Sequence, residues 1–290
     1  MTDTAYLRDL SHEGILAVRG PDAGKFLQGQ LTCNLNYLDG QRSSLGARCT
    51  PKGRMQSSFR IVPQGEDYLL AMARELVEPQ RADLARFAVF SKSKLHDESA
   101  EWVRFGLCGG DGALVSLGLD LSQTADQVAT AHNLIAIRLP DGRAELWVPA
   151  AEAETIQQRL AAQLAEASLE HWQLAQFRAG IGQVFGETRE LFIPQMINLQ
   201  ALDGVSFRKG CYTGQEIVAR MQYLGKLKRR LHRLAIENTD SPVPGRGMEL
   251  FSPVHNSSVG EVVLAARADG VLELLAVLLE DAAADGRIFL

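Results

Sequence analysis

This chain has no apolar run long enough to cross a bilayer. The stretch Val271 to Leu279 is interrupted by Glu273, whereas a membrane-spanning helix takes about 20 consecutive apolar residues. The first residues, Met1 to Tyr6, lack the basic start and apolar segment of a secretory signal. We therefore expect a cytoplasmic protein that makes no contact with a membrane.

Metal-binding and disulfide patterns are also missing. The 4 cysteines (Cys33, Cys49, Cys108 and Cys211) lie far apart without a Cys-x-x-Cys pair, and the 6 histidines form no His-x-x-x-His pair. These absences argue against a disulfide framework and against a self-contained zinc or iron–sulfur site, so we predict no metal site in the chain alone. The glycine-rich loops of nucleotide-binding proteins and the Gly-x-Ser-x-Gly elbow of hydrolases are absent too.

The composition is ordinary for a globular protein, with 46% hydrophobic and 22% charged residues over 290 positions. That length suits two or three domains. Two strand–strand–helix units predict an α+β fold with antiparallel sheets. The first comprises strands 55–62 and 68–73 with helix 75–88, and the second comprises strands 134–139 and 144–148 with helix 151–165. Further strands are expected at 14–19, 90–95 and 103–107, and helices at 22–27 and 169–178. The segment 44–48 leads into the first unit.

The sequence pattern changes after Arg230, from long strands and helices to short strands separated by turn residues. Short strand candidates at 231–236, 247–251, 258–265 and 271–279 are separated by Gly, Pro, Asn and Asp. This spacing predicts a small β-barrel of about 60 residues at the C-terminal end.

The most informative segment is Phe207 to Arg220, which reads Phe-Arg-Lys-Gly-Cys-Tyr-Thr-Gly-Gln-Glu-Ile-Val-Ala-Arg. Thr213 and Glu216 have the spacing of a capping box, which predicts a helix that starts at Thr213. Cys211 then precedes the positive end of that helix and follows the cations Arg208 and Lys209. Both influences favour the thiolate, the form of cysteine that attacks electrophiles or binds metal.

Other roles for Cys211 stay open at this point. A buried cysteine that packs as a small apolar side chain is the structural alternative. A papain-like pairing of Cys211 with one of the scattered histidines is a further alternative, although nothing near the cysteine in the sequence supports it. The glycines on either side, Gly210 and Gly214, are expected to let the backbone approach a ligand closely.

The segment Lys-Gly-Cys-Tyr-Thr-Gly-Gln-Glu resembles the signature of the YgfZ family of folate-binding proteins. Three other stretches resemble family motifs in the same order: 26–32, 51–55, and 192–195 with Asn198 and Leu199. The resemblance runs from about residue 15 to residue 230. On this basis the motif around the thiol comprises Lys209, Gly210, Tyr212, Gly214, Gln215 and Glu216, with Cys211 as the catalytic residue.

The resemblance implies a fold similar to the T-protein of glycine cleavage, and a role in supporting iron–sulfur enzymes and tRNA modification. It implies a discontinuous folate-binding domain at 1–45 and 100–225, an inserted subdomain at 46–99 and a β-barrel at 226–290. The expected ligand is tetrahydrofolate. The expected partners are iron–sulfur enzymes such as the radical-dependent tRNA methylthiolases.

Folate binding needs a flat slot, a few polar groups for the pterin ring and cations for the glutamate tail. Trp172 resembles the family's aromatic contact, with a role in the core as its alternative. Gln28, Gln30 and Asn198 are candidate amides that read the ring, and Arg220 is a candidate for the glutamate. A helix cap or a loop hydrogen bond is the alternative for these amides.

Two positions depart from the family pattern. Arg178 stands where T-proteins carry a glutamate that reads the pterin, and a guanidinium accepts no hydrogen bond; Glu187 or Glu190 is a candidate substitute. Gln56-Ser57-Ser58 stands where T-proteins carry a catalytic aspartate. Without that carboxylate, the alternative function of a folate-dependent aminomethyl or one-carbon transferase is disfavoured.

A basic run follows the cysteine motif. From Arg208 to Arg233 there are 8 lysines and arginines against the single acid Glu216, in a chain of net charge −5. A solvated strand face is the structural interpretation. A polyanion site is the functional one, with the glutamate tail of a folate, RNA phosphate or an acidic protein as candidates. Contact with tRNA through Lys226 to Arg233 would make the chain an RNA-binding module.

Overall fold

The computed structural model describes residues 5–236, 242–268 and 270–290. The expectation for the first residues, Met1 to Thr4, lies outside these ranges. The chain divides into two compact units, each built from separate segments. The first comprises Met1–Phe26, Leu35–Ser44 and Arg60–Trp172, and the second comprises Leu27–Asn34, Leu45–Phe59 and Gln173–Leu290. These two compact units have other boundaries than the three domains expected from the sequence. The units do not test that division, which stays a prediction.

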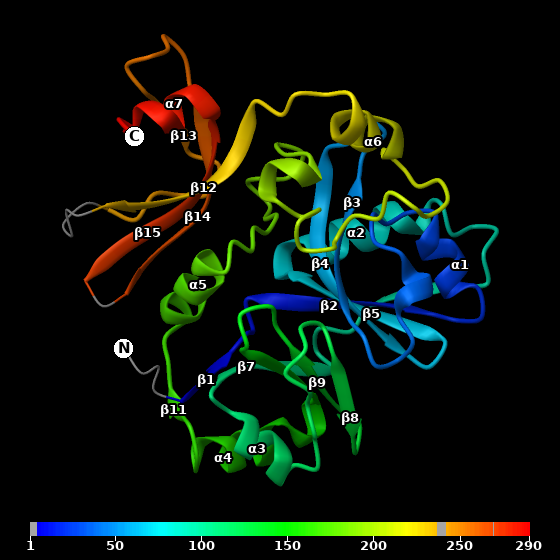
Figure 1. Cartoon of the computed structure of the whole chain (residues 1–290). Coiled ribbons are helices and arrows are strands. Elements are labelled where there is room, and N and C mark those ends of the chain that lie inside the picture. The colour runs from blue at the N-terminus through cyan, green and yellow to red at the C-terminus, as the bar shows by residue number, and fades with distance from the viewer. Residues whose placement is uncertain (1–4, 237–241, 269) are drawn as a thin grey trace. The chain divides into compact units, whose positions relative to one another are not determined.

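The first unit contains a six-stranded sheet in the order β11-β1-β7-β10-β9-β8. Neighbouring strands are antiparallel, apart from the parallel pair β1–β11. The strands are β1 (Tyr6–Asp9), β7 (Trp102–Cys108), β8 (Val128–Ala131), β9 (Leu134–Arg138), β10 (Ala144–Pro149) and β11 (Ala165–Glu166). Helices α3 (Asp111–Ser116) and α4 (Ala153–Ala161) cover one face of this sheet (Figure 1) through a core that includes Leu114, Leu146 and Leu160.

A second group of antiparallel strands completes the first unit. It contains β2 (Glu13–Arg19), β5 (Asp67–Ala73), β6 (Lys94–Asp97) and the second half of β4 (Met55–Gln64), with α2 (Arg74–Ala85) packed against β2, β5 and β6. Alternate residues such as Ile15 and Leu69 point to the six-stranded sheet and form a shared core with Ile137 and Trp147. Helix α1 (Ala23–Gln28) and the short η1 (Leu35–Tyr37) and η2 (Ala150–Glu152) lie between strands.

The second unit combines loops with a C-terminal sheet. It contains most of β3 (Ser44–Cys49), the first half of β4, most of α5 (Leu169–Arg178), η3 (Pro194–Ile197) and α6 (Gln215–Tyr223). The sheet runs in the order β12-β15-β14-β13, and α7 closes its apolar core together with Val262, Leu274 and Leu278. The bounds are β12 (Arg229–Ile236), β13 (Glu249–Leu250), β14 (Gly260–Ala268), β15 (Val271–Leu279) and α7 (Glu280–Asp285).

The α+β class predicted from the sequence is confirmed, and the C-terminal strands form a curled antiparallel sheet. A β-bulge between Val262 and Leu264 contributes to the curl, because the extra residue bends its strand. The strand expected at 90–95 is wrong in its first four residues, since β6 begins at Lys94. Within the described residues, no helix has both the length and the apolar character needed to cross a membrane.

Candidate functional site

Cys211 lies in the loop that leads into α6, and among the chain's four cysteines it is the exposed one. Cys33 and Cys49 are buried, and Cys108 is half-buried. Burial raises the pKa of the Cys49 thiol to about 12, because apolar surroundings disfavour its thiolate. Solvent and soluble reagents therefore have better access to Cys211 than to the other thiols.

Lys209 clamps the cysteine loop onto the segment Leu27–Asn34. Its Nζ donates hydrogen bonds to the carbonyl oxygens of Leu31 at 2.8 Å and Cys33 at 2.7 Å. Burial lowers the pKa of Lys209 to about 8, because the ammonium loses water without gaining a carboxylate. The sequence predicted Lys209 as a cation that activates Cys211, but the hydrogen bonds of its ammonium go to backbone carbonyls.

The same loop is attached at two further points. The hydroxyl of Thr32 donates to the carbonyl of Gly204 at 2.6 Å, and the Ser206 amide donates to the Thr32 carbonyl at 2.8 Å. On the other side of Cys211, Tyr212 is only 6% exposed and its ring centroid lies 5.3 Å from the Lys209 ammonium. Burial, with Cys33 and Cys49 nearby, raises the pKa of Tyr212. Cys211 is thus an exposed residue between two anchored neighbours, the half-buried Lys209 and the buried Tyr212.

The predicted capping box is wrong. Helix α6 begins at Gln215, and its N-cap is Gly214 in the left-handed conformation with φ of 87° and no side-chain cap. Thr213 instead donates its backbone amide to the carbonyl of Gly29 at 3.3 Å. Since the helix starts four residues beyond Cys211, its dipole acts on the thiol more weakly than expected.

The two glycines beside Cys211 differ in their surroundings. A Cβ at Gly214 would lie 2.5 Å from the carbonyl oxygen of Thr50 and 3.0 Å from Cβ of Cys49. A Cβ at Gly210 would meet no atom within 4 Å. The close approach at Gly214 is therefore to the chain itself rather than to a ligand.

The amide candidates for folate all lie in the second unit. Gln28 donates to Oδ1 of Asn34 at 2.7 Å, and Asn198 occupies the left-handed turn after η3 with φ of 59°. Oε1 of Gln30 is buried and has no hydrogen-bond partner among the described residues. That acceptor fits a ligand with an N–H group, as a pterin ring has.

Gln195 is a candidate that the sequence analysis did not single out, although it lies in the third family-like motif. Its Nε2 donates to the carbonyl of Val218 at 2.7 Å, which ties η3 to α6. Its Oε1 is buried without a described partner. The side-chain oxygens of Gln195 and Gln30 are therefore both buried acceptors that could receive a hydrogen bond from a ligand.

Trp172 is a core residue of the first unit, 4% exposed, which favours the structural alternative left open above. The guanidinium of Arg143 lies 3.8 Å from the ring centroid, and Gly106 packs closely against the ring. One face of the indole is thus already covered by a cation. Folate contact through Trp172 stays a prediction.

Arg178 is engaged by a carboxylate of the C-terminal sheet. Its Nη2 lies 2.7 Å from Oε1 of Glu273, which is 5% exposed, and Arg233 lies 3.7 Å from the other oxygen. The candidate substitutes for the missing glutamate are also paired. Glu187 lies 3.9 Å from Arg246, and Oε1 of Glu190 accepts a hydrogen bond from Gln56 at 3.3 Å.

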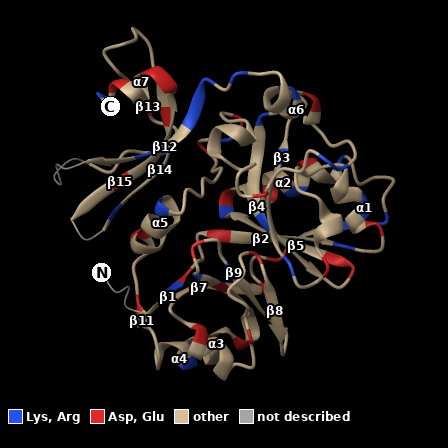
Figure 2. Ribbon diagram, in the orientation of Figure 1, with Lys and Arg blue, Asp and Glu red and all other residues tan. Residues whose placement is uncertain are grey.

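The basic run divides into neutralised and free cations. Arg229, Arg230 and Arg233 pair with Glu261, Glu280 and Glu273 respectively. Arg208, Arg220, Lys226 and Lys228 are exposed, and no described residue pairs with them. In Figure 2, blue ribbon marks the lysines and arginines of the segment between α6 and β12. The positive charge left for a partner is therefore nearer to Cys211 than the range Lys226 to Arg233 suggested.

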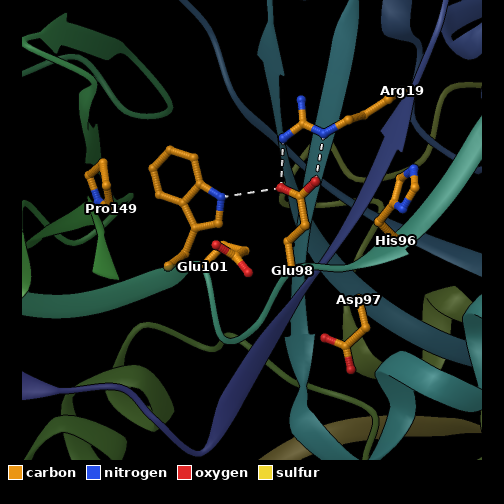
Figure 3. Close-up of a pocket in the computed structure, with 7 residues that line it drawn as sticks. Arg19, His96, Asp97, Glu98, Glu101 and Pro149 are labelled. Atoms are coloured by element: carbon orange, nitrogen blue, oxygen red, sulfur yellow. Dashed lines mark hydrogen bonds and ion pairs between the residues drawn. The ribbon is translucent and has the colours of Figure 1, made fainter. Parts of the chain in front are cut away.

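A hollow of about 520 Å³ lies in the first unit, away from every residue singled out in the sequence. Arg19 and Glu98 form a bidentate ion pair in it (Figure 3). Nε and Nη2 of Arg19 each donate to one carboxylate oxygen of Glu98 at 2.6 Å. The indole nitrogen of Trp102 donates to the same carboxylate at 3.4 Å. Because these groups satisfy one another, the hollow does not identify a ligand.

Metal binding by one loop is not supported by the geometry. Within the described ranges, no group of three or more His, Cys, Asp or Glu side chains is placed to hold a metal ion. Cys211 offers one sulfur ligand, so a bound metal or cluster would take its other ligands from a second molecule.

The chain is similar over most of its length to curated bacterial proteins. It is 34% identical over 287 residues to the tRNA-modifying protein YgfZ of Serratia proteamaculans, covering 97% of this chain and 87% of that protein. It is 38% identical over 250 residues to YgfZ of Photorhabdus laumondii, covering 84% and 74%. No family model matches the chain.

The fold has a solved counterpart. The glycine cleavage system aminomethyltransferase T of Bartonella henselae matches with a TM-score of 0.70, at 16% identity, over 95% of this chain and 78% of that one. This similarity establishes the fold, and the T-protein-like architecture expected from the sequence is confirmed.

Proposed function

Because the chain belongs to the YgfZ family of tRNA-modifying proteins, we propose that it supports tRNA modification in the cytoplasm by acting on iron–sulfur enzymes, with Cys211 as its essential thiol. Radical-type enzymes that methylthiolate tRNA are the proposed partners. The observation that carries this proposal is the exposed thiol between two anchors, Lys209 and Tyr212. Such a loop presents sulfur to another protein while the flanking backbone stays fixed.

Tetrahydrofolate is the proposed ligand. When bound, a reduced folate supplies one-carbon chemistry and a flat polar ring. The buried acceptor of Gln30 would receive an N–H of the pterin, with Gln28 and Asn198 as further amides. Arg220, exposed and without a described partner, would bind the glutamate tail.

The transferase alternative has less support. At the position of the T-protein aspartate, the Ser58 hydroxyl accepts a hydrogen bond from the Val184 amide at 2.8 Å, and Ser57 is buried. Neither hydroxyl substitutes for a carboxylate as an acid or base. We therefore propose an accessory factor. Measurable turnover with an aminomethyl donor would favour the transferase.

The test is complementation of a cell that lacks its own homologue. Cys211→Ser changes one atom at an exposed position, so its melting temperature should stay within about 1–2 °C of wild type. The same variant should leave methylthiolated tRNA as low as in the deletion strain. Cys108→Ser is the control and should restore methylthiolation.

Melting temperature and tRNA methylthiolation together distinguish a chemical role of Cys211 from a structural one. A structural cysteine would lower melting temperature and methylthiolation together. Full methylthiolation in cells that carry Cys211→Ser would mean that the thiol has no role, and it would favour a protein that acts by binding alone.

A further inference from the structure

The C-terminal end of α6 exposes apolar and aromatic side chains beside the cysteine loop. Tyr223 is 66% exposed and Leu224 is 85% exposed. The ring of Phe207 meets Tyr223 edge-on, with centroids 5.9 Å apart. This contact brings the start of the Cys211 motif against the end of the helix.

One cation, Arg220, lies on the same side of the helix as Tyr223, and three others lie close to this surface in the sequence. Arg220, Tyr223 and Leu224 follow the i, i+3, i+4 spacing, which places them on one face. Arg208 adjoins Phe207 in the chain, and Lys226 and Lys228 lie two and four residues after Leu224. From Phe207 to Ile236 the single acidic residue is Glu216.

The charge at this end of α6 differs from the charge of the strand that follows. In β12, Arg229 and Arg230 lie 2.8 Å from glutamate oxygens, and Arg233 lies 3.7 Å from one. The four cations before β12 meet no described partner. Unpaired cations around an exposed aromatic ring are typical of surfaces that bind nucleic acid single strands.

We propose that Arg208, Arg220, Tyr223, Lys226 and Lys228 form a platform for a single-stranded segment of RNA. The cations bind phosphates, Arg220 in competition with the glutamate tail of folate, and the open face of Tyr223 stacks on a base. This inference rests on the proposed function, because that function brings tRNA to the protein. It goes beyond it by assigning the RNA to specific residues beside the thiol.

An acidic protein is the competing occupant of this surface. A stable protein interface buries about 800 Å² on each partner around an apolar centre. The platform offers only Tyr223 and Leu224 as strongly exposed apolar side chains, whereas one ring is enough to stack one base. The observations therefore favour RNA.

Fluorescence anisotropy with a labelled RNA hairpin that has a seven-nucleotide loop tests the platform. Four phosphate contacts predict that the logarithm of the association constant falls with the logarithm of salt concentration with a slope of about −3. Lys226→Ala/Lys228→Ala should reduce that slope to about −1.4. Arg230→Ala/Arg233→Ala removes the same charge from paired positions and should leave the slope near −3.

Tyr223→Ala should weaken binding about 5- to 150-fold through the lost stacking. Equal effects of the two double variants, or poly-glutamate binding as tight as the RNA, would overturn the assignment. Cys211→Ser should bind the hairpin as wild type does. Failure of wild type to bind RNA, combined with loss of methylthiolation by Cys211→Ser in cells, would reject the platform and leave the proposed function standing.

Discussion

At the scale of single residues, the buried ammonium of Lys209 determines how the cysteine loop is held. Its two bonds satisfy carbonyls of a neighbouring segment, and its charge is held without a described carboxylate. Hydrogen bonds from a charged donor contribute about 1.5–3 kcal/mol. The free-energy cost of burying the charge offsets part of that gain, and the lowered pKa of Lys209 is the sign of this cost.

Lys209→Met should lower the free energy of unfolding by about 1–3 kcal/mol at pH 7, because two carbonyls lose their donor. Lys226→Met, at an exposed position without a described partner, should change it by less than about 0.5 kcal/mol. Urea unfolding measures both. Equal losses would mean that the clamp contributes nothing.

The Lys209 clamp also predicts a pH dependence. The lysine pKa falls from 10.5 in the unfolded chain to about 8 in the folded one, so between these values the unfolded state binds more protons. Stability therefore rises with pH across this window. The stability of wild type relative to Lys209→Met should increase between pH 8 and pH 10. A constant or shrinking difference would contradict the buried charge.

At the scale of elements, the start of α6 depends on a glycine rather than on a side-chain cap. Gly214→Ala meets both a left-handed backbone and the Thr50 carbonyl, so it should cost about 2 kcal/mol or more in unfolding free energy. Gly210→Ala, in open space, should cost less than about 0.5 kcal/mol. Thermal unfolding compares them, and equal costs would contradict the assigned geometry.

Helices and strands with a strong hydrophobic periodicity were predicted well from the sequence. Features that depend on contacts between residues far apart in the chain were predicted poorly. Helix α5 has the predicted bounds of Leu169 and Arg178. The capping box had the right residue types, but the left-handed Gly214 took the N-cap, a backbone choice that depends on its packing against Thr50 and Cys49. The short strand β1 was missed because four residues carry little periodic signal.

The candidate site was predictable in part for the same reason. The motif around Cys211 is contiguous, so its residues were found from the sequence. The bonds of Lys209 to Leu31 and Cys33 join positions more than 170 residues apart. The pairing of β12 arginines with glutamates of other elements also depends on the fold, and it changed which cations are free.

At the scale of the whole molecule, the chain has a T-protein-like fold, and we propose that it uses this fold for a different function. The fold match establishes the architecture alone. We propose that aminomethyl transfer is disfavoured, because Ser57 and Ser58 stand where the resemblance to T-proteins places a carboxylate. We propose that the chain nevertheless binds folate, through amides of the second unit.

Calorimetric titration should detect reduced folate, with triglutamyl folate binding more tightly than the monoglutamyl form. The difference should fade in salt, because the tail binds through cations. Gln30→Ala should weaken binding of both forms by about 1–2 kcal/mol, and Arg220→Ala should weaken chiefly the triglutamyl form. Absence of binding at millimolar ligand would remove folate from the proposal and point to Arg178 as the cause.

The central claim is that the loop presents Cys211 as the reactive thiol of the folded protein. Limited alkylation with iodoacetamide at pH 7, followed by mass spectrometry of each cysteine peptide, tests it most directly. The account predicts that Cys211 is labelled first, Cys108 more slowly, and Cys33 and Cys49 only on unfolding, since burial protects both and raises the pKa of Cys49. Labelling of any other cysteine ahead of Cys211 in the folded protein would contradict the claim.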